Sequence, residues 1–340
     1  MPLALAAAVV AAIATATTTS WWLARNAPRL GLVDVPNSRS AHRHSMPRAG
    51  GIGIAAGVLV GFLVLAAMRM PFTQPLLVAL AGSAAIAILG LLDDFRSIPA
   101  RYRLTVHALV AVAVVFELGG VAKLPLPPPL DFPLGWLGAP FAVLWLVTLT
   151  NFFNFMDGLD GLAGGQTIAT CAAVLLAGWA LGSTQFAIIL ATATCGFLIF
   201  NIPPARIFLG DVGSTALGFS LAALALLAPP SERHRAILVV AIALALFLLD
   251  PLETLVQRLR RGHRLNVAHR SHSYQQIARA IGGHWPVTAS LVLVGLLLAV
   301  GGGLSYRVRW LTWPLLGLAV IAFGAELIIA ARVPHVREVD

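Results

Sequence analysis

Five aspartates stand next to glycine or to another aspartate at the ends of apolar runs. They are Asp93 and Asp94 in LGLLDDF, Asp157 and Asp160 in NFFNFMDGLDGLAGG, and Asp211 in NIPPARIFLGDVGST. Carboxylate oxygens suit Mg²⁺, which usually binds through one or two carboxylates together with substrate phosphates. Glycine turns let the backbone approach a phosphate closely. The pattern therefore predicts a Mg²⁺ site, with Mn²⁺ as a possible substitute, for a phosphate-bearing substrate.

Each acidic motif also has a purely structural interpretation. Asp93 and Asp94 can form a solvated helix end paired with Arg96, although an acidic pair at a helix C-terminus opposes the helix dipole. The asparagines of NFFNF can bond to other helices, and Asp211 can cap a helix. These interpretations leave the flanking glycines and the repeated carboxylates unexplained, so we favour a functional role for the acidic motifs over a structural one.

Two basic segments accompany the acidic motifs, PNSRSAHRHSMPRAGGIG at 36–53 and RLRRGHRLNVAHRSHSYQQ at 258–276. In the second, His269, Arg270 and His272 are candidate donors to a sugar diphosphate. Membrane topology and anionic lipid explain scattered arginines equally well, but they do not require the His-x-x-His spacing. A zinc site at the two histidines is disfavoured because further ligands are missing.

The elements that must position these residues are membrane helices. Hydrophobic residues make up 59% of the chain and charged residues 11%, against about 25% charged in a soluble domain. Because lipid cannot satisfy backbone polar groups, apolar segments of this length should be helical. We predict an all-α polytopic membrane protein, a single catalytic domain over 1–340. Its roughly eleven transmembrane segments are 3–24, 50–69, 75–92, 104–121, 139–156, 164–181, 185–201, 213–229, 236–256, 286–303 and 310–330.

The distribution of positive charge predicts the orientation of these segments. Under this assignment 17 of the 23 Lys and Arg residues lie on one face. The positive-inside rule then places the N-terminus outside and the C-terminus in the cytoplasm. The net charge of +9 reflects topology and gives no reason to expect nucleic acid. The expected cytoplasmic loops, which contain all five aspartates, are about 25–49, 93–103, 157–163, 202–212 and 257–285.

Two other segments complete the topology. The first apolar run is not expected to be a cleaved signal peptide, because no basic residue precedes it and Arg25 and Arg29 follow it. The proline-rich stretch at 125–133 predicts a stiff, extended spacer on the outer face.

Taken together, the motifs resemble those of the polyprenyl-phosphate N-acetylhexosamine-1-phosphate transferases, a superfamily related to phospho-MurNAc-pentapeptide translocase. The matching segments are PRAGGIGI (47–54), LGLLDDF (89–95), NFFNFMDGLDGLAGG (151–165), FNIPPARIFLGDVGS (200–214) and HRSHSYQQ (269–276). The resemblance implies a Mg²⁺-dependent reaction in the bacterial inner membrane, with the site on the cytoplasmic face. A HexNAc-1-phosphate would pass from a UDP-sugar to undecaprenyl phosphate, releasing UMP and initiating O-antigen or another cell-surface glycan.

The resemblance also implies roles for the five aspartates. Asp93 or Asp94 would deprotonate or orient the lipid phosphate. Asp157 and Asp160 would form an acidic loop near metal and nucleotide, and Asp211 would be the principal metal ligand. Whether the reaction proceeds in one step or through a covalent aspartyl intermediate stays open.

Further residues match the binding positions of this superfamily. The residues expected to bind the nucleotide are Asn154, Asn201 and Phe208. Those expected to bind the sugar diphosphate are His269, Arg270 and His272. Those expected to contact the lipid phosphate are Arg48, Arg101 and Arg103. Relatives often have Lys in place of the last two, and since Arg cannot donate a proton, only a charge role carries over.

The final motif bears on the sugar and the partners. HRSHSYQQ looks more like O-antigen initiating enzymes that use 6-deoxy sugars, such as N-acetylfucosamine or N-acetylquinovosamine, than the His-rich form of GlcNAc enzymes or lipid I synthase. The expected partners are a UDP-HexNAc, undecaprenyl phosphate and membrane lipid, and a homodimer is compatible with the resemblance. The main alternative, a transporter with intramembrane carboxylates, would place its acidic residues near the membrane midplane.

Overall fold

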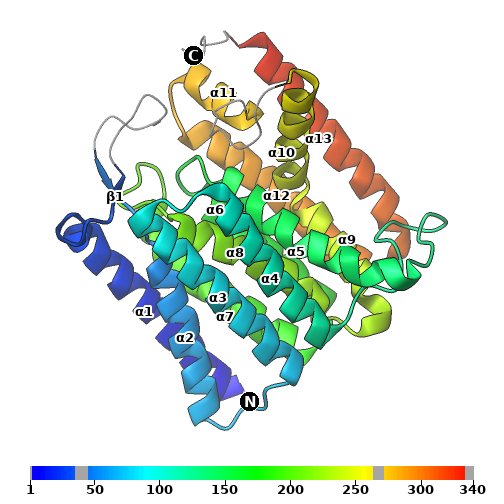
Figure 1. Cartoon of the computed structure of the whole chain (residues 1–340), viewed down its shortest axis with the longest axis horizontal. Coiled ribbons are helices and arrows are strands. Elements are labelled where there is room, and N and C mark those ends of the chain that lie inside the picture. The colour runs from blue at the N-terminus through cyan, green and yellow to red at the C-terminus, as the bar shows by residue number, and fades with distance from the viewer. Residues whose placement is uncertain (1, 35–44, 263–271, 334–340) are drawn as a thin grey trace.

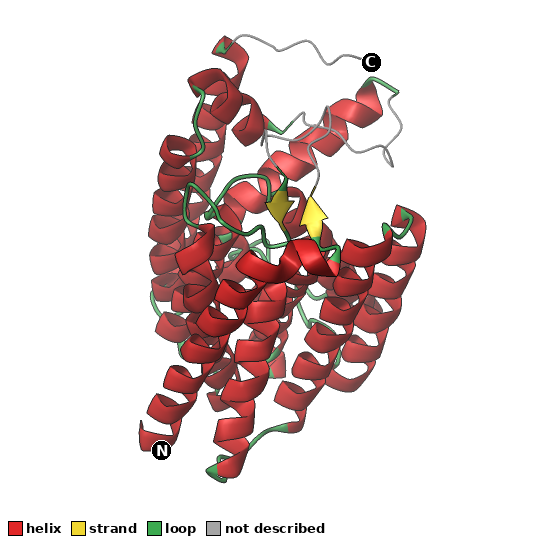
Figure 2. Ribbon diagram, turned by 90° about the vertical axis from the view of Figure 1, so that its left-hand side faces the viewer, coloured by secondary structure: helices red, strands yellow, loops and turns green. Residues whose placement is uncertain are grey.

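The computed structural model describes residues 2–34, 45–262 and 272–333, which form a helical bundle with one short two-stranded ladder (Figures 1 and 2). In chain order the α-helices are α1 Pro2–Asn26, α2 Gly51–Ala67, α3 Gln74–Arg96, α4 Ala100–Leu118, α5 Gly138–Phe155, α6 Leu162–Ala177, α7 Leu181–Asn201, α8 Asp211–Leu226, α9 Arg233–Ala243, α10 Ala245–Arg260, α11 Ser273–Ile281, α12 Trp285–Ser305 and α13 Thr312–Arg332. The short elements are η1 Ala27–Leu30, β1 Val33–Asp34, β2 Met46–Pro47, η2 Gly135–Leu137, η3 Pro230–Glu232 and η4 Arg309–Leu311.

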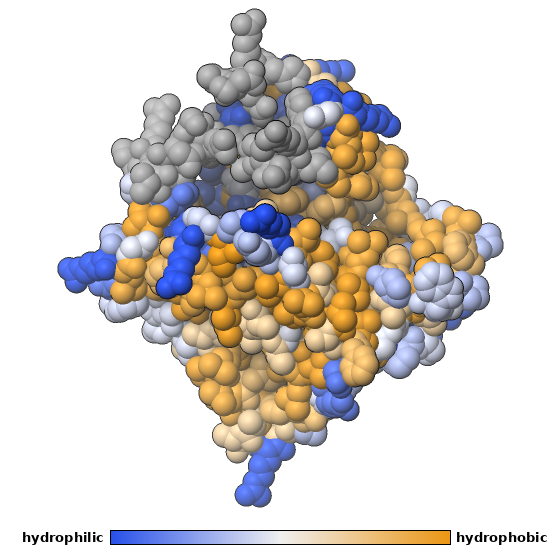
Figure 3. All heavy atoms as spheres, viewed as in Figure 1, coloured by the Kyte–Doolittle hydropathy of each residue, from blue (hydrophilic) through white to orange (hydrophobic). Residues whose placement is uncertain are grey.

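The helices confirm an all-α polytopic membrane protein. Six helices in the described residues are long and apolar enough to cross a membrane, and a seventh span arises if α8 and the helix after it, bent by 110°, count as one. Each predicted apolar segment overlaps a helix. Figure 3 shows hydrophobic side chains across the middle of one face, with hydrophilic ones toward its margins. The predicted number of eleven crossings and their orientation stay predictions.

Two local expectations were wrong, and a third segment contains a helix that was not expected. The segment 236–256 is not one helix, because the backbone leaves helical geometry at Leu244 (φ −104°, ψ 21°), between α9 and α10. The expected loop at 257–285 contains helix α11, whose polar and apolar residues occupy opposite faces. The proline-rich stretch folds back on itself, since Leu124 N–H donates to Phe132 O and Leu134 N–H to Ala122 O.

The centre of the bundle is α8, which is buried on nearly every side and packs against α3 and α5. On one flank, α1 presents a row of buried alanines toward α2 and α7. A Cβ on Gly57 would lie 2.7 Å from the Ala12 carbonyl oxygen, so only glycine permits this close helix packing. This tight framework fixes the N-terminal end of α8, where the acidic motifs meet.

Candidate active site

The carboxylate of Asp94 caps the N-terminus of α8 from the neighbouring helix α3. Its Oδ1 accepts the N–H of Asp211 at 3.1 Å, and its Oδ2 accepts that of Val212 at 3.0 Å. The side chain is 3% exposed. The positive end of the α8 dipole thus stabilises an acid that the dipole of α3 would disfavour. Burial also excludes the solvated helix end as the explanation for this aspartate pair.

Arg103, near the start of α4, joins two of the acidic motifs. Its Nη1 lies 2.5 Å from Asp93 Oδ2 and 2.9 Å from Asp211 Oδ2. Asp93 is buried at 6% exposure, whereas the side chains of Arg103 and Asp211 are each 30% exposed. Arg103 and Asp211 are therefore accessible to a substrate, while the buried carboxylate of Asp93 holds Arg103 from the protein interior.

A second arginine, Arg48, approaches Asp94 from the segment before α2. Its Nε lies 3.9 Å from Asp94 Oδ1, and its Nη2 donates to the Asp94 backbone carbonyl. The side chain is 27% exposed. Gly51 brings this segment to α8, because a Cβ there would lie 2.2 Å from the Gly213 Cα. Two arginines thus surround the aspartates with positive charge.

Asn154, in the last turn of α5, contacts the carboxylate of Asp211. Its Nδ2 donates to Asp211 Oδ1 at 2.8 Å and to Ser214 Oγ at 2.7 Å. One turn earlier, Asn151 Nδ2 donates to Val147 O at 2.7 Å and lies 3.4 Å from His107 Nδ1. The predicted nucleotide ligand Asn154 therefore orients Asp211.

Asp157 lies in the loop after α5, half-buried among other acids. Burial raises the pKa of its carboxyl group well above the usual range, and the charges of Asp211, Asp160 and Asp94 raise it further. Helix α11 covers the next residue, since a Cβ on Gly158 would lie 2.4 Å from the Tyr274 hydroxyl. The loop thus concentrates negative charge at a place that a cation would stabilise.

Asp160 and Asn201 brace the loops of the site. Asp160 Oδ2 accepts Ala205 N–H at 3.0 Å, and its Oδ1 lies 3.3 Å from His284 Nδ1. Asn201 Oδ1 accepts Gly161 N–H at 3.0 Å, while its Nδ2 donates to Ile207 O at 2.9 Å. These bonds tie the loop after α5 to the loop before α8.

Phe208 belongs to the same framework. Its backbone N–H donates to Pro47 O at 2.8 Å, and its carbonyl accepts Gly50 N–H at 2.9 Å. The loop before α8 is thereby fixed to the segment that carries Arg48. The predicted nucleotide position lies beside the acidic cluster, with its ring half-buried.

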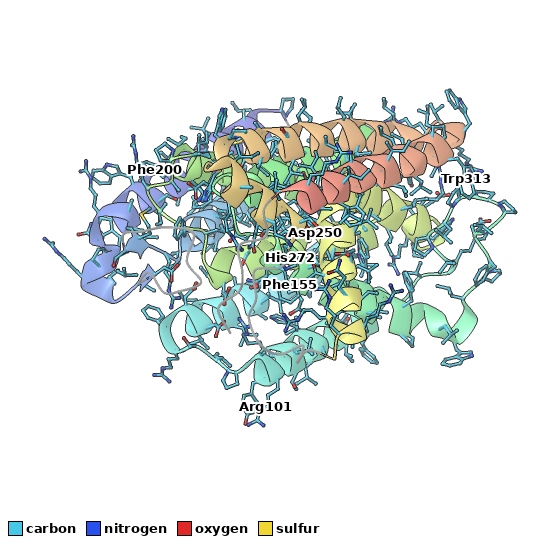
Figure 4. The ribbon with its side chains drawn as sticks, turned by 90° about the horizontal axis from the view of Figure 1, so that it is seen from above. Arg101, Phe155, Phe200, Asp250, His272 and Trp313 are labelled. Atoms are coloured by element: carbon cyan, nitrogen blue, oxygen red, sulfur yellow. The ribbon has the colours of Figure 1, made fainter. Side chains whose placement is uncertain are left out.

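Of the remaining predicted residues, the structure describes Arg101 and His272. Arg101 is exposed and stacks on Tyr102, with its Cζ 4.7 Å from the ring centroid, and it points away from the molecule in Figure 4. His269 and Arg270 lie outside the described residues. His272 is buried, with Nδ1 2.8 Å from Asp250 Oδ1 (Figure 4). Tyr274, two residues on, donates its hydroxyl proton to Phe155 O at 2.9 Å and so ties α11 to α5.

Sequence reasoning missed three acidic or basic partners: Asp250, His284 and Glu326. Asp250 and Glu326 lie inside apolar segments, at 0% and 6% exposure. An acid in such a segment is costly unless it has a role, so its presence there was the available signal. His284 carried no comparable signal, because only folding brings it to Asp160.

The donor chemistry of the cluster is compatible with Mg²⁺. In the part of the chain that the structure describes, no three His, Cys, Asp or Glu side chains are grouped to hold a metal ion by themselves. Mg²⁺ requires no such group when substrate phosphates complete its coordination. The crowded, hard oxygen donors of Asp157 and Asp211 fit this mode of binding.

Comparison with known proteins finds a matching family and relatives that are named as transferases of phosphorylated sugars. Residues 76–228, which include all five aspartates, match Glycosyl transferase family 4. The chain is 30% identical over 310 residues to the undecaprenyl-phosphate alpha-N-acetylglucosaminyl 1-phosphate transferase of Yersinia pestis, covering 87% of this chain and 83% of that protein. It is 28% identical to a probable undecaprenyl-phosphate N-acetylglucosaminyl 1-phosphate transferase of Bacillus subtilis (81% and 78% covered). It is also 30% identical to the phospho-N-acetylmuramoyl-pentapeptide-transferase of Halalkalibacterium halodurans (75% and 81% covered).

Proposed function

The chain belongs to glycosyl transferase family 4, a family of polyprenyl-phosphate sugar-1-phosphate transferases, and from that membership we propose that it transfers a HexNAc-1-phosphate from a UDP-sugar to undecaprenyl phosphate. The products are undecaprenyl-diphosphate-HexNAc and UMP. The relatives' names supply the lipid acceptor and the transferred sugar 1-phosphate, the motif resemblance implies the UDP-sugar donor, and the aspartate and arginine cluster supplies the chemistry. We assign this activity to one catalytic domain over residues 1–340.

One observation carries the proposal: Asp211, partly exposed, is held by Arg103, by Asn154 and by the α8 N-terminus that Asp94 caps. These contacts come from four different helices. Phosphoryl transfer depends mainly on positioning and charge neutralisation, which such a preorganised group provides. The aspartates lie at helix ends and in loops, unlike the midplane acids that a transporter would use.

The proposed reaction forms one P–O bond and breaks another. An oxygen of the lipid phosphate attacks the β-phosphorus of the UDP-sugar, and the bond from that phosphorus to the bridging oxygen breaks as UMP leaves. Arg48 and Arg103, partly exposed, neutralise phosphate charge. Asp93 or Asp94 orients the lipid phosphate, Asp93 doing so through Arg103.

Asp211 and Asp157 would hold Mg²⁺ together with the substrate diphosphate. The ion would polarise the phosphate oxygens and offset the charge on the departing UMP. Asn201 and Phe208 hold the loop before α8, which we propose contacts the nucleotide. Asp160 bonds to the same loop through the backbone N–H of Ala205. His269, Arg270 and His272 remain the proposed contacts to the sugar diphosphate, and Arg101 a proposed contact to lipid phosphate at the surface.

The sugar and the cellular face are further parts of the proposal. We assign the site to the cytoplasmic face of the bacterial inner membrane, where UDP-sugars are made, with the orientation that the charge distribution predicts. N-acetylfucosamine, N-acetylquinovosamine and GlcNAc are the candidate sugars. The product would initiate an O-antigen or another surface glycan.

Purified protein in detergent tests the proposal when it is supplied with Mg²⁺, undecaprenyl phosphate and a panel of UDP-sugars. Mass spectrometry of the lipid fraction should show undecaprenyl-diphosphate-HexNAc for one sugar above the others. Reactions without lipid phosphate are the control and should give no product. Absence of a lipid product with every UDP-HexNAc would refute the proposed function.

A further inference from the structure

An apolar cavity lies between α2 and α3 (Figure 1), with α7 and α8 behind them. Its volume is about 180 Å³. Most of its wall consists of glycine, alanine and larger aliphatic residues, and small ones such as Gly51, Ala87 and Ala216 leave the space open. Leu59 of α2, which is 60% exposed, and the exposed Ala84 of α3 also line it, so the cavity opens toward the lipid around the bundle.

The polar side chains in the wall leave no place for water. They are Ser83 and Ser220, and Ser220 Oγ donates to Ser83 Oγ at 2.9 Å. Ser83 Oγ in turn donates to the Ala79 carbonyl oxygen at 2.9 Å. Because an ordered internal water needs about two to four polar partners, the cavity is suited to hydrocarbon.

The cavity has the depth expected for a chain that is anchored beside the acidic site. It begins at Gly51 and Gly213, in the first turns of α2 and α8, and reaches Phe62, about 16 Å further along α2. There Phe62 packs on Phe72 and Phe186, with ring centroids 5.9 and 6.2 Å from its own, and these rings close the far end. The depth is about half of a hydrocarbon core of roughly 30 Å.

Two features connect the cavity with the acidic site. Every residue of α8 after Asp211 is buried except Ala216, so this helix is accessible both at the site and in the cavity. Arg48 joins the ends of the two helices that border the cavity, since it precedes α2 and its Nη2 donates to the backbone carbonyl of Asp94 at the end of α3. A phosphate held by Arg48 therefore lies at the end of a space that accepts an apolar chain.

We propose that this cavity binds the first isoprene units of the acceptor lipid while Arg48 contacts its phosphate. The inference rests on the proposed function, which supplies a prenyl phosphate as the acceptor. A bilayer phospholipid in the same position would place its phosphodiester at Arg48 and block the acceptor, whereas a prenyl phosphate uses both contacts productively.

Photo-crosslinking tests which lipid occupies the cavity. The photoreactive p-benzoylphenylalanine replaces Leu59 or, in the control, Leu63 one turn further along α2. These two leucines are 60% and 57% exposed, but of the two only Leu59 lines the cavity. The protein is irradiated in nanodiscs of phosphatidylglycerol with a small share of undecaprenyl phosphate, and mass spectrometry identifies the attached lipid.

We expect undecaprenyl phosphate to be attached at position 59 far beyond its share of the lipid, and phosphatidylglycerol to predominate at position 63. The same proportion of the two lipids at both positions would overturn the proposal, as would phosphatidylglycerol alone at position 59.

Ala216→Phe provides a kinetic readout, because it fills the cavity from α8. We expect the KM for undecaprenyl phosphate to rise at least about tenfold while the KM for the UDP-sugar is unchanged. Ala81→Phe, the same substitution at an exposed position of α3 outside the cavity, is the control and should behave as wild type.

An unchanged KM for undecaprenyl phosphate in folded Ala216→Phe would overturn the proposal, and the crosslinking decides if this variant does not fold. If wild type releases no UMP with any sugar, the proposed function fails, while the crosslinked lipid still identifies the occupant of the cavity.

Discussion

Asp94 and Asp211 lie 117 positions apart in the chain, yet the carboxylate of Asp94 accepts the backbone N–H of Asp211 at 3.1 Å. The bond places the end of α3 against the beginning of α8. It also turns the side chain of Asp211 toward Arg103 and Asn154. A cap between helices thus builds the acidic site.

Removal of this cap should weaken both the fold and the activity. We expect Asp94→Ala to lower the free energy of unfolding by about 1–3 kcal/mol, because two buried N–H groups lose their acceptor. The melting temperature in detergent measures the effect. Glu117→Ala, which removes an exposed acid from α4, is the control and should leave the melting temperature nearly unchanged.

Replacement of Arg103 tests the bridge between Asp93 and Asp211. We expect Arg103→Lys to lower kcat/KM for UMP release at least about tenfold, because a shorter point charge cannot reproduce the guanidinium contacts. Arg96→Lys, an exposed change at the end of α3, should behave as wild type. Equal activity of the two variants would remove Arg103 from the site.

The sequence supplied the helices and the acidic motifs but not their connections. Apolar runs predicted the helix positions well, because lipid forces such runs to be helical. The convergence of Asp93, Asp94 and Asp211 was also expected. The bridging role of Arg103 was not, because this residue was expected only to contact the lipid phosphate. Long-range bonds such as these have no local signal.

Other features escaped prediction for physical reasons. Asp160 and Asn201 were expected at the substrate, and the structure shows their side chains bonded to loop backbone. The break at Leu244 has no helix-breaking residue of its own. The buried pair of Asp250 and His272 depends on α11. This helix was not predicted because it is short and of mixed polarity, and its residues were assigned to a loop.

The pKa of Asp157 predicts a pH-dependent stability. Burial and nearby carboxylates raise this pKa above its ordinary value of 3.8, so the folded protein binds a proton that the unfolded chain releases. Stability should therefore fall as pH rises from about 3.8 toward the raised pKa. Without added divalent metal, Asp157→Asn should melt higher than wild type at pH 8 and by a smaller margin at pH 5. A difference that is independent of pH would contradict the raised pKa.

Membrane orientation can be tested with reporters. The 17 to 6 distribution of Lys and Arg predicts that a reporter fused after Asp340 reads cytoplasmic and that one inserted near Lys123 reads external. Alkaline phosphatase and green fluorescent protein fusions report the two compartments. The reverse result would place the site away from the pool of UDP-sugars and would refute the proposed orientation.

The identity of the released nucleotide tests the central claim most directly. If the β-phosphorus is the atom attacked, each lipid product should be accompanied by one UMP, with the β-phosphate retained in the lipid diphosphate. Chromatography of the nucleotides after reaction with undecaprenyl phosphate and Mg²⁺ measures this ratio. Asp211→Asn, still folded by its melting curve, should release less than about a hundredth as much UMP. Release of UDP in place of UMP, or near-normal UMP release by Asp211→Asn, would contradict the account.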